Sequence, residues 1–130
     1  MANWNDVAGY LRQNFRIKED SGSFLTLVFD VGGGRSQLVM VSKGSMDATD
    51  EEFAVIASPI ADARVTNLSS LLEEAADYVV GGVVKIGDTL ALRHAVPLSN
   101  LDLSELMGPM DLVMNAADLM ESKFTGTDRM

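Results

Sequence analysis

Few side chains in this sequence stand in patterns that could make or break covalent bonds. His94 is the only histidine of the 130 residues and cysteine is absent, so a tetrahedral zinc site would lack nitrogen and sulfur ligands. His94 follows Leu90 and Leu92 at strand spacing, which favours a half-buried or edge imidazole over a catalytic base. No Gly-x-Ser-x-Gly motif supplies a nucleophile. We therefore expect no enzyme activity, no catalytic residue and no metal site.

Two other groups of residues resemble ligand-binding motifs only in part. The glycines at 32–34 lack the Lys-Ser/Thr pair of a phosphate-binding loop and lead into a strand, so they predict a turn. The acidic residues Asp47, Asp50, Glu51 and Glu52 miss the twelve-residue spacing and the turn glycine of a calcium loop. These carboxylates indicate a solvated loop, and we expect no bound cofactor.

The charge of the chain restricts its partners. The formal net charge is −9, and the ten lysines and arginines are scattered along the sequence. Nucleic-acid binding depends on clustered basic side chains, so we expect no nucleic-acid partner. No segment approaches the roughly 20 apolar residues that span a bilayer, and residues 1–10 lack the pattern of a secretory signal. We expect a cytoplasmic protein with no membrane partner.

The first half of the chain predicts a helix followed by three strands. Apolar residues recur at three- and four-residue steps from Trp4 to Phe15, as in an amphipathic helix. The segments 24–31, 37–41 and 53–60 are rich in Val, Leu, Ile and Phe, which predicts a three-strand antiparallel meander. Pro59 lacks an N–H group, so we expect it at a sheet edge or a strand end.

The second half predicts a helix, a hairpin and a closing helix. The middle helix begins near Asn67 and ends at Gly81-Gly82. Strands at 83–86 and 90–96 flank Gly87-Asp88, a two-residue hairpin turn. Asp102 and Glu105 have the spacing that predicts a cap at the start of the closing helix. Apolar residues then recur along it from Leu103 to Phe124. Pro109 leaves two alternatives, a kink in this helix or a short turn before a helix that starts near Gly108.

The fold class predicted by this order is α+β, with a single domain over residues 1–130 and a frayed tail at 125–130. The strands are apolar on both faces. In the first of them Leu25, Leu27, Phe29 and Val31 point to one side, and Phe24 and Val28 to the other. If the helices cover one side, the second face needs another subunit, a client or a helix of its own.

The second half of the chain resembles a known group of proteins. The features that carry the resemblance are the pair Leu71-Leu72, the hairpin around Gly87-Asp88, and the segment Val96 to Leu106, which reads VPLSNLDLSEL. Together with the element order, they are similar to the type III secretion chaperone-like proteins, including the YbjN family of bacterial sensory transduction regulators. The resemblance implies an α+β fold with a twisted antiparallel sheet, a homodimer, and apolar patches that hold an extended segment of a client protein.

Candidate partner-binding residues follow from the apolar strand and from the methionine-rich closing helix. Methionine side chains adapt to irregular partners, and they also fill irregular cores. The candidates are Leu25, Val28 and Phe29 on the sheet and Met110 and Met114 on the helix.

Three functions remain open at this point. The first is a non-catalytic module that engages a client polypeptide as a homodimer. The second is a YbjN-like regulator that binds a folded signalling partner. The third is a small-ligand-binding or enzymatic domain with a pocket between the sheet and the closing helix, near Arg93 and His94.

Overall fold

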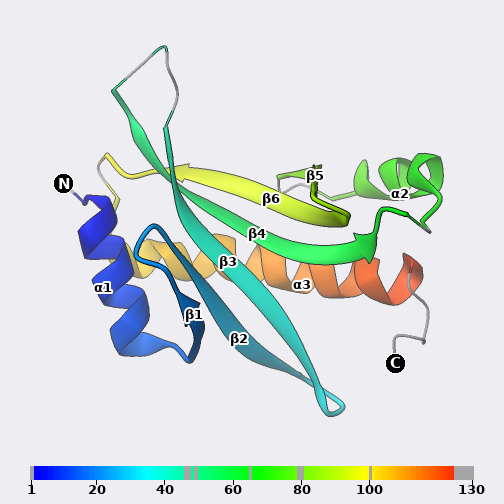
Figure 1. Cartoon of the computed structure of the whole chain (residues 1–130), viewed down its shortest axis with the longest axis horizontal. Helices are drawn as coiled ribbons and strands as arrows, with labels where there is room; N and C mark the ends of the chain where they lie inside the picture. Colours follow the sequence, from blue (N-terminus) through cyan, green and yellow to red (C-terminus); the bar gives the residue numbers. More distant parts are fainter. Residues whose placement is uncertain are drawn as a thin grey trace.

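The computed structural model describes residues 2–45, 48, 50–64, 66–78, 81–99 and 101–124. The tail at 125–130, which we expected to fray, lies outside the described residues, as does Asp47 of the acidic loop. Within these ranges the chain has an α+β fold, in which an antiparallel sheet packs against helices (Figure 1).

The order of elements agrees with the sequence prediction except for one additional strand. The helices are α1 (Trp4–Asn14), α2 (Leu68–Ala75) and α3 (Met107–Phe124), with a 3₁₀ turn, η1 (Leu103–Leu106), directly before α3. The strands are β1 (Ile17–Asp20), β2 (Phe24–Gly32), β3 (Arg35–Ser45), β4 (Glu52–Asp62), β5 (Gly82–Ile86) and β6 (Thr89–Pro97).

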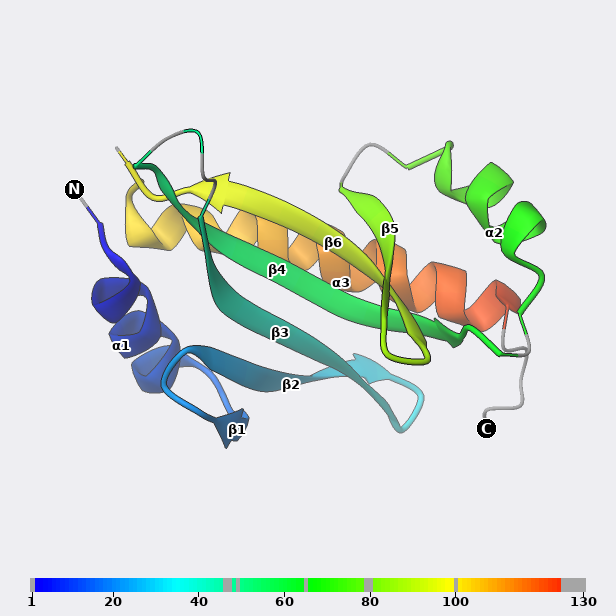
Figure 2. The ribbon, with the colours of Figure 1, turned by 45° about the horizontal axis from the view of Figure 1, so that its top comes forward.

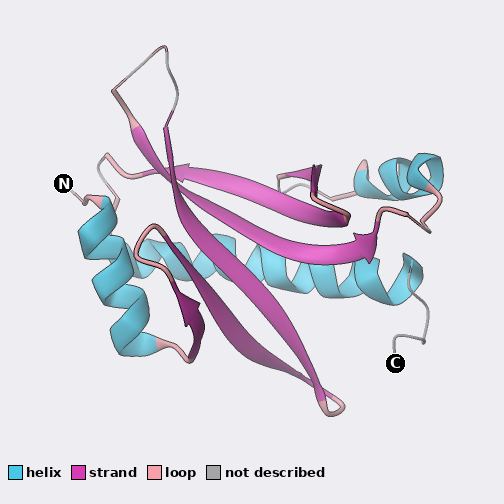
Figure 3. Cartoon of the chain, in the orientation of Figure 1, coloured by secondary structure: helices cyan, strands magenta, loops and turns pink. Residues whose placement is uncertain are grey.

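The six strands form one sheet in the order β1-β2-β3-β4-β6-β5, and every neighbouring pair is antiparallel (Figure 3). The predicted meander is present, and the predicted hairpin pairs β5 with β6. Pairing of β6 with β4, from Phe53 opposite Pro97 to Asp62 opposite Thr89, joins the hairpin to the meander. The two predicted strand groups therefore share one continuous sheet.

All three helices pack on the same face of this sheet. Figure 2 shows α3 running behind β4 and β6, with α1 at one end of the sheet and α2 at the other. A first core lies between α1, the start of α3 and the inward side chains of β2, β3 and β4, and it includes Leu11, Leu27, Val39, Ile56 and Met110. A second core, which includes Ile60, Leu71, Leu92 and Met120, joins α2 and the end of α3 to β4 and β6.

The helix ends follow local capping, with one error in our prediction. Asn67 accepts a hydrogen bond from the Ser70 N–H at 3.1 Å, so α2 begins where the sequence predicts. The helix ends at Ala75, six residues before Gly81, and the predicted end is therefore wrong. After Ala75 the backbone tightens, since the Asp77 N–H donates to the Glu74 carbonyl and the Tyr78 N–H to the Ala75 carbonyl.

Local backbone geometry accommodates both prolines that interrupt the predicted elements, Pro109 and Pro59. Pro109 lies in the first turn of α3, where its missing N–H costs no helical hydrogen bond, so the alternative of a helix that starts near Gly108 is correct. Pro59 is not at an edge or a strand end, and that prediction is wrong. It lies inside β4 at a bulge, beyond the point where the ladder to β3 stops at Met40 and Ala57.

Candidate functional site

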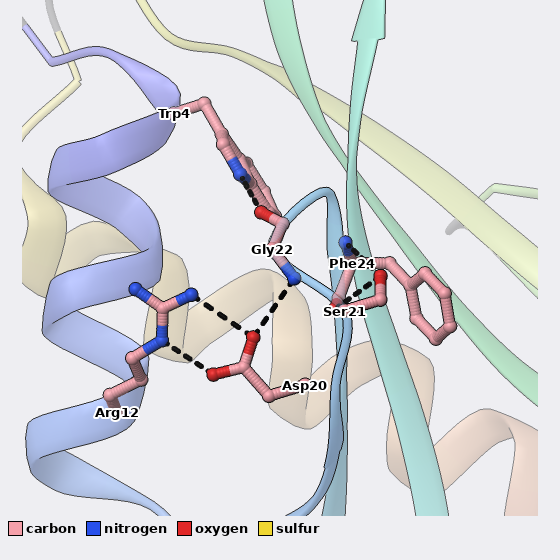
Figure 4. A network of polar contacts seen from close by, with 6 residues as sticks. All are labelled: Trp4, Arg12, Asp20, Ser21, Gly22 and Phe24. Atoms are coloured by element: carbon pink, nitrogen blue, oxygen red, sulfur yellow. Dashed lines mark hydrogen bonds and ion pairs between the residues drawn. The ribbon is translucent and has the colours of Figure 1, made fainter.

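A network of polar contacts fixes one corner of the sheet to α1 (Figure 4). Trp4 Nε1 donates to the Gly22 carbonyl at 2.7 Å. Arg12 donates to both carboxylate oxygens of Asp20, at 2.6 and 3.0 Å, and the Gly22 N–H donates to Asp20 at 3.0 Å. The Arg12 hydrogen bond, followed by that of Gly22, lowers the pKa of Asp20 below its ordinary value. These contacts position β1 and its turn at the sheet edge.

The orientation of β1 is set by its register on β2. Asp20 pairs with Leu25 and points toward the helices, where it meets Arg12. Glu19 pairs with Thr26 and therefore points to the opposite side of the sheet. Its carboxylate is exposed, and it makes no hydrogen bond or ion pair with another residue in the part of the chain that the structure describes.

The side of the sheet that faces away from the helices is mostly apolar. We call it the open face. Its side chains are assigned by register and by alternation with the buried core residues of the same strands. The half-buried apolar members on β2, β3 and β4 are Phe24, Val28, Leu38, Met40, Phe53, Val55 and Pro59. No described helix of the chain covers this surface.

A shallow hollow of about 330 Å³ lies on the open face. It is lined by Gly44, Ser45, Phe53, Val55, Arg93 and Ala95. The walls are mainly apolar, and Arg93 supplies the only full charge among these lining residues. Gly44 leaves room here, because a Cβ atom at this position would lie 2.5 Å from Val55 Cγ2. The hollow suits an apolar side chain with an acidic neighbour.

The described helices also expose four leucines, two on α2 and two on α3. Leu68 and Leu72 of α2 are each 50% exposed, and Leu112 and Leu119 of α3 are 53% and 56% exposed. We call these four residues the leucine surface. Both pairs lie at spacings of one or two helical turns, so each pair shares one helix face. Exposed leucines that repeat along a helix face suit contact with another protein.

Contacts between side chains fasten α2 to the end of α3 and so fix the helix that carries Leu68 and Leu72. Lys123 Nζ donates to Glu74 Oε2 at 2.6 Å, and the Tyr78 hydroxyl donates to the same oxygen at 3.3 Å. The Lys123 hydrogen bond is the main cause of the lowered pKa of Glu74. Burial, followed by the charge of Glu74, raises the pKa of Tyr78.

The predicted partner-binding residues are divided between the core and the surface. Leu25 is fully buried and Met110 is 2% exposed, so neither is accessible to a partner in this structure. Phe29 and Met114 are half-buried and pack against the first core. Val28 alone of the five points to the open face. The predicted division of β2 is confirmed for Leu25, Leu27 and Phe29 on one side and Phe24 and Val28 on the other. Val31, predicted with the first group, lies in the register shift between Asp30 and Gly32.

The residues considered for chemistry are not brought together. His94 is half-buried, as predicted, but it points toward the helices, whereas its neighbour Arg93 lies on the open face. The hollow that contains Arg93 is thus on the far side of the sheet from the pocket we considered. Gly33 and Gly34 form the β2–β3 turn with positive φ angles. No group of three metal-ligating side chains occurs among the described residues.

The chain matches no protein-family model, and no curated protein is detectably similar to it. The resemblance to secretion chaperones and YbjN proteins therefore stays a proposal. None of the described helices is long and apolar enough to cross a membrane.

Sequence reasoning missed the leucine surface and Glu19, and it placed Arg93 at a pocket on the helix side of the sheet, whereas Arg93 lies on the open face. The Leu112 and Leu119 spacing of seven residues was readable, but it lay beside the stronger core pattern of the same helix. Glu19 gave no signal, because β1 reads IKED and only its pairing with β2 shows it to be a strand.

Proposed function

We propose that this chain is a non-catalytic protein-binding module, related in fold to type III secretion chaperones, that engages a client polypeptide as a homodimer. The open face carries the proposal. Its apolar residues Val28, Leu38, Met40 and Val55 are not covered by any helix in the described ranges, and burial of apolar surface is the main favourable term in protein association. An apolar sheet face of this kind favours a protein partner over a small solute.

The leucine surface supplies a second place for a partner, and we assign the client to it. Leu112 and Leu119 are more than half exposed and repeat along α3 with the spacing of two turns. The net charge of −9 favours a client segment that combines apolar and basic residues. The same charge supports a protein client over a nucleic acid.

The test is capture of partners by the tagged protein from an extract of its source cells, followed by binding of a purified fragment. Three proteins are compared: the wild type, a Leu112→Ser/Leu119→Ser variant, and a Gln13→Ala control, which alters an exposed side chain on α1. We expect one polypeptide in stoichiometric amount with the wild type and the control. We expect an unfolded fragment of it to bind both of these at least about tenfold more tightly than the leucine variant, a difference of about 1.4 kcal/mol.

Other results would contradict the proposal. Equal binding by the leucine variant would exclude this surface for the client. Capture of folded partners whose unfolded fragments do not bind would favour the regulator that resembles YbjN proteins. No captured protein would exclude client binding and favour a small ligand in the hollow beside Arg93.

A further inference from the structure

Six residues form a straight row across the open face. The register of each strand pair aligns them in the order Glu19, Thr26, Met40, Ala57, Arg93 and Gly82. Residues opposite one another in neighbouring strands point to the same side of a sheet. The two charged members of the row, Glu19 and Arg93, therefore project from the same face.

The charges in this row are arranged symmetrically about Met40. Glu19 lies two strands from Met40 on one side, and Arg93 lies two strands from it on the other. With strands about 4.8 Å apart, Glu19 and Arg93 are roughly 19 Å from each other. They cannot pair within one chain, and both are exposed. Neither makes an ion pair with any other residue in the described ranges.

The neighbouring row has the same symmetry in its apolar residues. Phe24 of β2 pairs with Ser42 of β3, and Ser42 pairs with Val55 of β4. Phe24 and Val55 therefore lie at equal distances on either side of β3. Along β3 itself the open face presents Leu38, Met40 and Ser42.

From these relationships we propose that the open face is the interface of the homodimer, with a two-fold axis that runs along β3 and passes by Met40. This inference rests on the proposed homodimer and names its surface. Rotation about such an axis places Arg93 of each copy against Glu19 of the other. It also places Phe24 against Val55, and Met40 against its own equivalent. The same rotation therefore forms two acidic–basic contacts and a central apolar patch between the two copies.

The charges select this axis over the other simple arrangements. A two-fold axis along the row would place Arg93 opposite Arg93 and Glu19 opposite Glu19, and like charges in contact oppose association. An axis shifted by half a strand spacing, to lie between Met40 and Ala57, would place Arg93 opposite Thr26. Of these three axes, only the one along β3 pairs both charges. Because each chain carries a net charge of −9, the two copies repel at long range, so opposite charges inside the interface matter for the choice of partner.

The contacts of α1 fix the backbone next to Glu19, so that the Glu19 side chain stays on the face used by the proposed interface. The Arg12 contact fixes the adjacent Asp20 on the helix side, at 2.6 Å. Trp4 holds the following turn through the Gly22 carbonyl at 2.7 Å. The strand that carries Glu19 is thus fixed from the opposite side, and the Glu19 side chain stays accessible to a second copy.

Charge reversal tests this interface in the purified chain, with no client present. Sedimentation equilibrium is measured for the wild type, Arg93→Glu, Glu19→Arg, their equimolar mixture and the double variant, after circular dichroism has shown that each is folded. We expect a wild-type dimer and a dissociation constant raised by about tenfold or more in each single variant. The mixture should recover wild-type affinity as a heterodimer. In it, the carboxylate introduced at position 93 of one chain meets the guanidinium introduced at position 19 of the other. The double variant should dimerise with itself.

The outcomes separate this inference from the proposed function. A wild-type dimer whose single variants associate normally, or whose mixed variants fail to recover affinity, overturns the interface and leaves the homodimer and its client standing. A strictly monomeric wild type overturns both the interface and the homodimer. Client binding is tested separately at the leucine surface, so either proposal can fail without the other.

Discussion

Gln37 and Ser58 form a buried hydrogen bond at the place where the ladder between β3 and β4 ends. Gln37 Nε2 donates to Ser58 Oγ at 2.8 Å and to the Pro59 carbonyl at 3.0 Å, and Ser58 Oγ donates to the Leu38 carbonyl at 2.6 Å. Gln37 is 2% exposed and Ser58 is fully buried. These side chains thus join the two strands beyond their last backbone pair. They supply hydrogen bonds to the Leu38 and Pro59 carbonyls beside the bulge.

Replacing Ser58 should destabilise the fold by leaving buried polar groups without their partners. We expect Ser58→Ala to lower the free energy of unfolding by about 1–3 kcal/mol. Adding Gln37→Leu should restore part of the loss, because both polar partners are then gone. Ser122→Ala, at an exposed position of α3, is the control and should change little. Urea unfolding measures all four proteins, and a double variant no more stable than Ser58→Ala would contradict this account.

The closing helix should respond differently to truncation at its buried and exposed methionines. Met110 is 2% exposed and Met107 is 37% exposed. We expect Met110→Ala to cost about 2–5 kcal/mol of unfolding free energy. Met107→Ala should stay within about 0.5 kcal/mol of the wild type. Met114→Ala should fall between them, since Met114 is half-buried against the first core. Thermal or urea unfolding measures the losses, and equal losses at Met107 and Met110 would contradict the burial of Met110 in the first core.

The pKa of Asp62 should be lowered to about 2, because Arg64 donates hydrogen bonds to it from its side chain and then from its backbone N–H. The depressed value means that ionised Asp62 favours the folded state above the ordinary carboxyl pKa of 3.8. This contribution is lost as the pH falls from about 4 toward 2. NMR titration of the Asp62 carboxyl carbon measures the value. In Arg64→Ala the pKa should rise while staying below 3.8, since the backbone donor remains; an unchanged value would contradict the assignment.

Alanine substitutions at Gly81 and Gly87, which both have a positive φ angle, should lower stability by different amounts. A Cβ atom on Gly81, at φ +63°, would lie 1.9 Å from the Arg93 carbonyl oxygen, whereas one on Gly87, at φ +61°, would meet nothing within 4 Å. Gly87→Ala should cost about 1–2 kcal/mol from backbone conformation alone. Gly81→Ala should cost more and should speed hydrogen exchange of the β5 amides. Similar hydrogen-exchange rates of the β5 amides in both variants would contradict the close approach of Gly81 to the Arg93 carbonyl.

Local patterns predicted most of the elements, because helices and strands here follow hydrophobic periodicity. The helix from Trp4, the hairpin at Gly87-Asp88 and the two faces of β2 were each readable from residues close in sequence. The pairing of β4 with β6 could not be predicted in this way, since it joins residues more than 25 positions apart, such as Asp62 and Thr89.

The candidate site was predicted only in outline for the same reason. The sequence indicated an uncovered apolar face, and Val28 lies on it. It also placed Leu25 and Met110 at a partner surface, where the structure has core residues. Glu19 and Arg93 lie in one row of the sheet only because of the register of five strands. No short segment of the sequence encodes that register.

The two edges of the sheet limit how other chains can attach. The edge strands β1 and β5 have four and five residues, whereas β3 and β4 inside the sheet have eleven each. Each edge also carries an exposed lysine, Lys18 or Lys85, and β1 is bulged. Short, charged and irregular edges offer few free backbone groups to an incoming strand. Growth into filaments by strand addition is thereby hindered, and a partner is left to recognise this protein through its faces.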